Sequence, residues 1–226
     1  MGTVGDTSAR DYTELRPEVG SCYANGWRRI RPYFVELLLI TIVYFAVLAP
    51  AGALSEAGDE VGRGGSGWKA LALIYLILVV APIKYGVAYA YMKAARGDAL
   101  KVSDMFDVFG NYLNAVLGNL FVFTVIGIGI VLFIVPGVVF ACKLAFVPYL
   151  IVDRKMEVVE AVKLSWSMTS GHAWTIFLMA LLSVPIVIVG LACLGVGIIG
   201  AVILLGLAFG SLYHAVSSRE ETPQQT

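Results

Sequence analysis

The sequence predicts an all-α, polytopic membrane protein in which six transmembrane helices form three hairpins. Of its 226 residues, 59% are hydrophobic and 14% are charged, and the mean hydropathy is +0.83. A soluble domain is nearer half apolar and a quarter charged, so lipid is the expected solvent. Six apolar runs also approach the roughly 20 residues that a helix needs to cross a bilayer. These runs are 33–53, 70–92, 113–135, 137–152, 173–192 and 195–215.

Short divisions between the later runs predict the hairpins. The third and fourth runs are separated by Pro136-Gly137, where proline removes a helix donor and glycine tolerates a turn. The fifth and sixth are divided near Leu194-Gly195. The fourth run is short and contains Pro148, so its helix either tilts little or continues to Arg154. The charged pair Asp153-Arg154 at this helix end is interpreted as a solvated boundary.

Basic residues predict the orientation of the chain. Lys and Arg near short loops are retained on the cytoplasmic side of a membrane. They are concentrated before the first run and after the second and fourth, which places both chain ends in the cytoplasm. The residues are Arg28, Arg29, Arg31, Lys93, Arg96, Lys101, Arg154, Lys155 and Lys163.

Two polar segments on this cytoplasmic side have the apolar spacing of amphipathic helices. Spacings of three and four place apolar residues on one stripe, which suits a helix at the lipid headgroups. Charged residues, including Asp104, fall on the opposite face, which we expect to be polar. The stripe could equally pack on the transmembrane bundle, and both can hold. We expect Phe106, Phe109, Leu164 and Trp166 to face membrane or bundle, and Asp107, Glu160 and Lys163 to face water.

The apolar runs and the polar ends of the chain predict its domain organisation. We expect one membrane domain over 14–216 between disordered polar tails at 1–13 and 217–226. The first 28 residues contain acidic side chains and no apolar core, so they do not predict a cleavable signal peptide. The first helix would then direct insertion.

Composition and motifs exclude several functions. The formal net charge is zero, which gives no basic field for nucleic acid. There is no phosphate-binding loop, nucleophile elbow or zinc spacing, so we expect no enzyme, metal or cofactor. The cysteines, Cys22, Cys142 and Cys193, are far apart and are interpreted as buried apolar residues. His172 and His214 stand alone at helix ends, and we expect them to be satisfied by water or backbone.

Three charged residues form the candidate site. Lys84 and Lys143 each lie nine or ten residues inside an expected helix, close to the bilayer midplane at about 1.5 Å per residue. Such groups usually face a bundle interior or a wet cavity. Glu36 is the acidic residue placed to reach one of them. The site either binds an anionic group, such as a lipid phosphate, or makes a structural contact, and the structural interpretation is favoured.

Small residues and prolines complete the pattern. Gly206-x-x-x-Gly210 allows two helix backbones to approach closely. Packing within the chain is its commoner use, and a homodimer or another membrane-protein partner is the alternative. Pro82 and Pro185 should kink their helices.

Several short segments carry a family resemblance. They are Gly86-x-x-x-x-Tyr91-Met92-Lys93-x-x-Arg96-Gly97, Asp104-Met105-Phe106, Pro136-Gly137, Pro148-Tyr149-Leu150-Ile151-x-Asp153, and Glu160-Ala161-x-x-x-Ser165 with Gly171. With them, residues 20–216 resemble the membrane domain fused to some bacterial glycerophosphoryl diester phosphodiesterases, a superfamily that includes stand-alone prokaryotic membrane proteins of unknown function. The resemblance implies six helices with interfacial helices. It implies no hydrolysis, because it does not extend to the catalytic barrel of the fused enzymes.

The leading hypothesis is therefore a non-enzymatic protein of a prokaryotic inner membrane that acts as a scaffold or interacts with membrane lipids. The alternative is a small transporter or channel that binds an anionic substrate at Lys84 and Lys143.

Overall fold

The computed structural model describes residues 16–60, 65–192 and 196–221, and these ranges contain helices and turns but no strand. Six helical segments are long and apolar enough to cross a membrane, which confirms the predicted helix content and number. They are Phe34–Ala57, Gly67–Arg96, Val102–Leu132, Val135–Asp153, Ala173–Ala192 and Gly197–Ser218. The tail 1–13, the division near Leu194-Gly195 and Cys193 lie outside the described ranges.

The helices follow one another with short connections. The first group is α1 (Val19–Ile30), α2 (Phe34–Glu60), α3 (Gly65–Tyr75), the π-helix η2 (Leu76–Val80) and α4 (Ala81–Arg96). The second is the 3₁₀ helix η3 (Val102–Asn111), α5 (Tyr112–Leu132), α6 (Ile134–Lys143) and α7 (Val147–Asp153). The third is α8 (Val158–Thr169), α9 (Ala173–Ala192) and α10 (Val196–Glu221).

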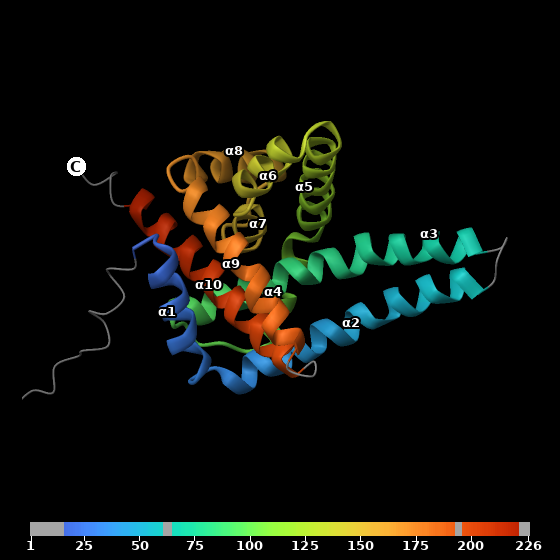
Figure 1. Ribbon diagram of the computed structural model, residues 1–226, viewed down its shortest axis with the longest axis horizontal. Coiled ribbons are helices and arrows are strands. Elements are labelled where there is room, and N and C mark those ends of the chain that lie inside the picture. The colour runs from blue at the N-terminus through green and yellow to red at the C-terminus, as the bar shows by residue number, and fades with distance from the viewer. Residues whose placement is uncertain (1–15, 61–64, 193–195, 222–226) are drawn as a thin grey trace, which may run out of the picture.

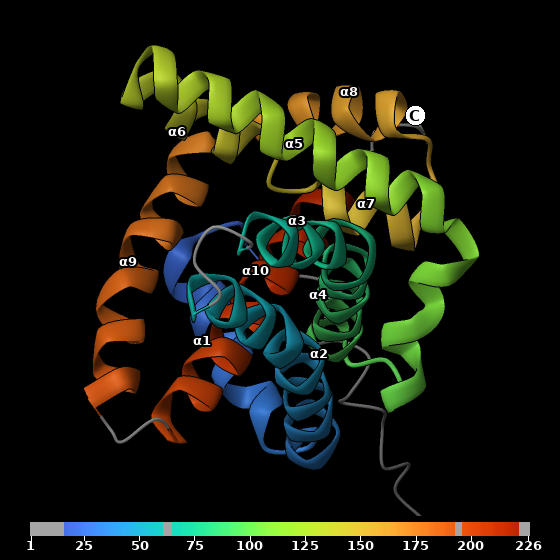
Figure 2. The same cartoon turned by 90° about the vertical axis from the view of Figure 1, so that its right-hand side faces the viewer.

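The long helices pack in pairs, but the pairs diverge. Helix α2 packs along α3, α5 along α6, and α9 along α10. The α2–α3 pair extends away from α1 and from the C-terminal end of α10 (Figure 1). Viewed along that pair, α5 and α9 both run across its direction (Figure 2). The described helices therefore do not form one parallel bundle with a common interior.

Helix α4 is the centre of the fold. It contacts α1, α2, α5, α7, α10 and η3, and two clusters of buried apolar side chains meet on it. Tyr85 and Met92 belong to the cluster with α7, α9 and α10. Val87 and Tyr91 belong to the cluster with α2, η3 and α10. The core of the molecule is thus assembled around one helix rather than inside a ring of six.

Glycines allow the closest approaches to α4. A Cβ atom on Gly86 would lie 1.8 Å from the backbone oxygen of Met105, so η3 packs directly on the backbone of α4. Gly206 faces the ring of Tyr91, and a Cβ on Gly210 would lie 2.8 Å from Cα of Met92. The Gly206 and Gly210 face of α10 is therefore filled by α4 of the same chain, and a homodimer through these glycines would require α4 to move.

The α5–α6 pair and α7 differ from the predicted second hairpin in two places. The turn between α5 and α6 is at Phe133, whose backbone is extended, and Pro136 and Gly137 lie inside the first turn of α6. Proline fits there because the first turn of a helix needs no amide donor. The fourth apolar run is broken between α6 and α7 at residues 144–146, upstream of Pro148. Pro148 then lies in the first turn of α7.

The two segments expected at the interface are helical, and each has one buried face. In η3 the buried residues include Asp104, so the prediction that this carboxylate faces water is wrong. In α8 the buried residues are Ala161, Ser165, Met168 and Thr169. Phe106, Phe109 and Trp166 are exposed, as are Asp107, Glu160 and Lys163, while Leu164 is partly exposed.

Two smaller predictions can also be compared with the fold. Cys22 and Cys142 are both buried, as predicted. Helix α10 continues to Glu221, so the predicted disordered tail at 217–226 begins too early. Ser217 is itself buried within that helix.

Candidate functional site

The structure does not bring the three predicted charged residues together. Lys84 is the only exposed residue of α4. Lys143 is half-buried at the end of α6, and Glu36 is half-buried near the start of α2. Within the described residues, no hydrogen bond or ion pair joins any two of them. Lys84 therefore does not face the packed interior of the described residues.

Lys143 has a different set of neighbours from those predicted. Its Nζ donates a hydrogen bond to Oγ of Ser170 over 2.9 Å and lies 5.4 Å from the ring centre of Trp166. Its carbonyl oxygen accepts hydrogen bonds from Ser165 Oγ at 2.8 Å and Thr169 Oγ1 at 3.3 Å. The break after α6 frees this carbonyl, and α8 satisfies it. The prediction of a midplane position assumed one straight helix from Lys143 to Asp153, and the break between α6 and α7 removes that assumption.

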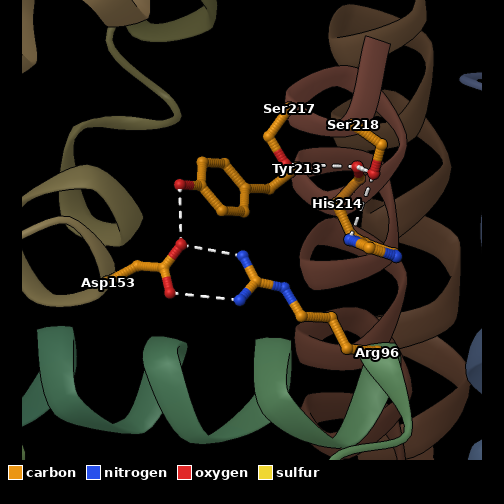
Figure 3. A network of polar contacts seen from close by, with 6 residues as sticks. All are labelled: Arg96, Asp153, Tyr213, His214, Ser217 and Ser218. Carbon is orange, nitrogen blue, oxygen red and sulfur yellow. Dashed lines mark hydrogen bonds and ion pairs between the residues drawn. The ribbon is translucent and has the colours of Figure 1, made fainter. Parts of the chain in front are cut away.

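The strongest polar cluster lies where α4, α7 and α10 meet (Figure 3). The Arg96 guanidinium binds both carboxylate oxygens of Asp153, with Nη1 to Oδ1 at 3.1 Å and Nη2 to Oδ2 at 2.7 Å. Tyr213 donates its hydroxyl to Oδ2 of Asp153 over 3.0 Å. Two parallel bonds between a planar guanidinium and a carboxylate fix direction as well as distance. We call this set the Arg96–Asp153–Tyr213 cluster.

Aromatic rings shield the cluster from one side. The ring of Tyr213 stacks on Tyr149 with centroids 5.0 Å apart and meets Phe146 edge-on at 5.6 Å. The Arg96 guanidinium lies 5.9 Å from the Tyr213 ring centre. The side chains of Arg96 and Asp153 are 24% and 14% exposed, so the ion pair is largely removed from solvent. Together with Tyr213, this ion pair joins α4, α7 and α10.

A second ion pair joins the same end of α4 to η3. Lys93 Nζ binds Oδ2 of Asp104 at 2.8 Å, and the same oxygen accepts the backbone N–H of Lys101 at 2.9 Å. Between these elements Gly97 has φ of 91°, a left-handed conformation that ends α4. A Cβ on Gly97 would lie 2.9 Å from the guanidinium nitrogens of Arg29.

Two asparagines connect further elements to this end of the molecule. Asn25 of α1 donates through Nδ2 to the carbonyl of Ala95 at 3.1 Å and to Ser211 Oγ at 2.9 Å. Asn111 donates through Nδ2 to the carbonyls of Ile151 at 3.0 Å and Met156 at 3.2 Å. These amides tie α1, α4, α7 and α10 at positions where helix ends leave carbonyls unpaired.

Sequence reasoning missed the Arg96–Asp153–Tyr213 cluster. It used Arg96 for orientation and treated Asp153 as a solvated helix boundary. One signal was available, since Arg96 and Asp153 each lie at the end of an apolar run on the same predicted side. His214 is on the neighbouring turn of α10, where Ser218 Oγ donates to its carbonyl at 2.7 Å. His172 Nδ1 is buried without a hydrogen-bond partner among the described residues.

The cluster can hold helices together, but it lacks the composition of a metal centre. The described residues contain no group of three or more His, Cys, Asp or Glu side chains placed to hold a metal ion. Three surface cavities are lined by apolar side chains, between α6 and α9, between α2 and η2, and between α1 and α9.

The helices and composition together are those of a multi-pass membrane protein. Comparison of the chain with protein-family models, curated proteins and solved structures finds no match.

Proposed function

We propose that this chain is a non-enzymatic protein of a prokaryotic inner membrane that acts as a lipid-interacting scaffold. One observation carries the proposal, the separation of apolar surface from polar contacts. Large exposed apolar side chains cover α2, α3, α5 and α9, while α4, α7 and the described part of α10 contribute none. The apolar surface faces the solvent that such residues require, which is lipid.

The diverging helix pairs support the same proposal. Helices that must enclose a transport pathway present polar groups to a common interior. Here the described pairs point in different directions (Figure 2), and Lys84 and Lys143 share no contact. Lipid would fill the space between the helix pairs. The polar contacts among α4, α7 and α10 would hold the pairs together where these three helices meet. We favour this over the transporter hypothesis.

We further propose that both chain ends face the cytoplasm, with α1, η3 and α8 at the inner membrane interface. The basic residues in and near α1, α4 and α8 support this orientation. Cysteine labelling in intact cells tests it. Ser55→Cys, near the far end of α2, should react with an impermeant maleimide, whereas Ala99→Cys should react only after permeabilisation. Reaction of Ala99→Cys alone in intact cells would invert the orientation.

The family resemblance adds to the proposal, because it implies a membrane domain without the catalytic barrel. The decisive experiment compares lipid retention with anion flux. Purified protein should carry co-purified phospholipid, identified by native mass spectrometry, and vesicles containing it should pass anions no faster than protein-free vesicles. Protein that is free of lipid, or vesicles that become anion-permeable, would refute the scaffold function.

A further inference from the structure

The junction of α6, α8 and α9 combines a positive charge with an apolar cavity. The cavity, of about 230 Å³, is lined by Val139 and Cys142 of α6 and by Ala173, Trp174 and Phe177 of α9. Residues three and four apart lie on one face of a helix. Val139, Cys142 and Lys143 have this spacing, so Lys143 continues the face of α6 that lines the cavity.

The polar partners of Lys143 lie at the same end of α9. Ser170, which binds Lys143 Nζ at 2.9 Å, is three residues before Ala173 in the cavity wall. Trp166 lies under the ammonium group at 5.4 Å and also contacts Phe140 of α6 at 6.1 Å between ring centres. An ammonium group, a hydroxyl and an indole therefore gather beside an opening that is otherwise apolar.

We propose that this junction is a binding site for an anionic phospholipid. The cavity between α6 and α9 takes part of an acyl chain, and the headgroup phosphate accepts a hydrogen bond from Lys143 Nζ. Ser170, whose hydroxyl donates to the carbonyl of Trp166 over 2.7 Å, accepts from the same ammonium group and positions it. Charge complementarity selects the occupant, because a zwitterionic lipid offers the lysine no net negative charge. Trp166 suits the boundary between headgroups and acyl chains. The inference rests on the proposed lipid-interacting function and assigns it a location.

Native mass spectrometry of protein delipidated and then mixed with equal amounts of phosphatidylglycerol and phosphatidylcholine tests the site. Wild type should retain the anionic lipid preferentially. Lys143→Met should reduce that preference about fivefold, the effect of one basic residue near an anionic surface. Lys143→Arg should preserve it. Lys84→Met removes an exposed lysine outside the site and should leave the preference unchanged.

Two phenylalanine substitutions test the binding of the acyl chain separately from the binding of the headgroup. Ala173→Phe should reduce retention of both lipids, whereas Ala180→Phe, an exposed position on the same helix, should not. Excess inorganic phosphate should compete weakly. Complete displacement of lipid by phosphate would show a free-anion site and overturn the proposal.

Equal losses for Lys143→Met and Lys84→Met would also overturn it, because only general surface charge would then act. Thermal unfolding of each variant identifies misfolded protein, and Lys143→Arg tests the charge if Lys143→Met unfolds. If the site is wrong but the proposed function is right, total lipid retention stays at the wild-type level while the preference is insensitive to Lys143. Loss of all lipid from wild type would instead refute the function.

Discussion

The first and second helical segments of each helix pair differ in how much of their surface the chain itself covers. In the most apolar stretches of the first segments, 22%, 22% and 17% of residues are buried, and in the second segments 44%, 50% and 50% are buried. The second segments contain α3, η2 and α4 in the first pair, α6 and α7 in the second, and α10 in the third. The difference teaches that in each helix pair one segment is covered more by the protein and the other faces more of the surrounding solvent. We call these the inner and outer segments.

The Arg96–Asp153–Tyr213 cluster follows the same division. Arg96, Asp153 and Tyr213 all belong to inner segments, and so do the close-packed Gly86 and Gly210. An ion pair removed from solvent is tolerated only where good geometry and further hydrogen bonds offset the loss of hydration. Inner segments provide that environment, and outer segments provide apolar surface. Matched substitutions on the two kinds of segment can test whether the division is energetic as well as geometric.

The largest expected difference concerns two phenylalanines. Phe146, between α6 and α7, is fully buried, whereas Phe123 of the outer helix α5 is 75% exposed. Phe146→Ala should lower the free energy of unfolding by about 3–5 kcal/mol, because it leaves a cavity. Phe123→Ala should change it by less than about 0.5 kcal/mol. Titration with denaturing detergent measures both, and equal losses would remove the distinction between inner and outer segments.

Two glycines give the next largest difference. A methyl group at Gly86 of α4 would collide with the backbone of Met105, whereas one at Gly127 of α5 would meet nothing within 4 Å. Gly86→Ala should destabilise the protein by about 3 kcal/mol, the upper part of the range for overpacking. Gly127→Ala should stabilise it by about 0.5–1 kcal/mol through helix propensity. A neutral Gly86→Ala would mean that η3 does not pack on α4 as described.

The ion pair of the Arg96–Asp153–Tyr213 cluster should contribute slightly less. Arg96→Gln leaves the Asp153 carboxylate without its guanidinium, and we expect a loss of about 2–3 kcal/mol, below the range for a fully buried pair because both side chains retain some exposure. Lys84→Gln on the same helix is the control, with a change under about 0.5 kcal/mol. Thermal unfolding in detergent compares them, and equal shifts would argue against a structural role for the pair.

Removing one hydroxyl from the cluster gives a smaller effect. Tyr213→Phe keeps the ring that stacks on Tyr149 and deletes the hydrogen bond to Asp153. We expect a loss of about 1 kcal/mol, the usual net contribution of one hydrogen bond. In the Arg96→Gln background the loss should change, since the two groups share one carboxylate. Strict additivity in a double-mutant cycle would show that Tyr213 and Arg96 act independently.

The sequence predicted the helices well because apolar length is a local property. Each of the six runs was visible without knowledge of its neighbours. The break at residues 144–146 was not visible, since it depends on Ser165 and Thr169 reaching the carbonyl of Lys143 from α8. The depth predicted for Lys143 depended on the same unbroken helix.

Side-chain partners were less predictable because they depend on how the hairpins pack. Asp153 looked like a solvated helix end, and only the approach of α4 and α10 makes it the acceptor of three hydrogen bonds. Asp104 likewise looked exposed on an amphipathic stripe, but Lys93 draws it inward. The spacing Gly206-x-x-x-Gly210 predicted a close contact between helices. It did not indicate that the contacting helix is α4.

The smallest expected effect is an absence of reaction at Cys22, which tests whether α1 belongs with the inner segments. Cys22 is fully buried, and burial raises the pKa of its thiol from 9.0 to about 11. The thiolate is the reactive form, so at pH 8 a maleimide should label Ser55→Cys but leave Cys22 unmodified until the protein is unfolded. The pH profile sharpens the test. Labelling of the exposed control should level off near its ordinary pKa of about 9, whereas any slow labelling of Cys22 should still rise between pH 9 and 11. Rapid labelling of Cys22 at pH 8 would mean that α1 separates from α10. The packed core around α4 would then be formed without α1.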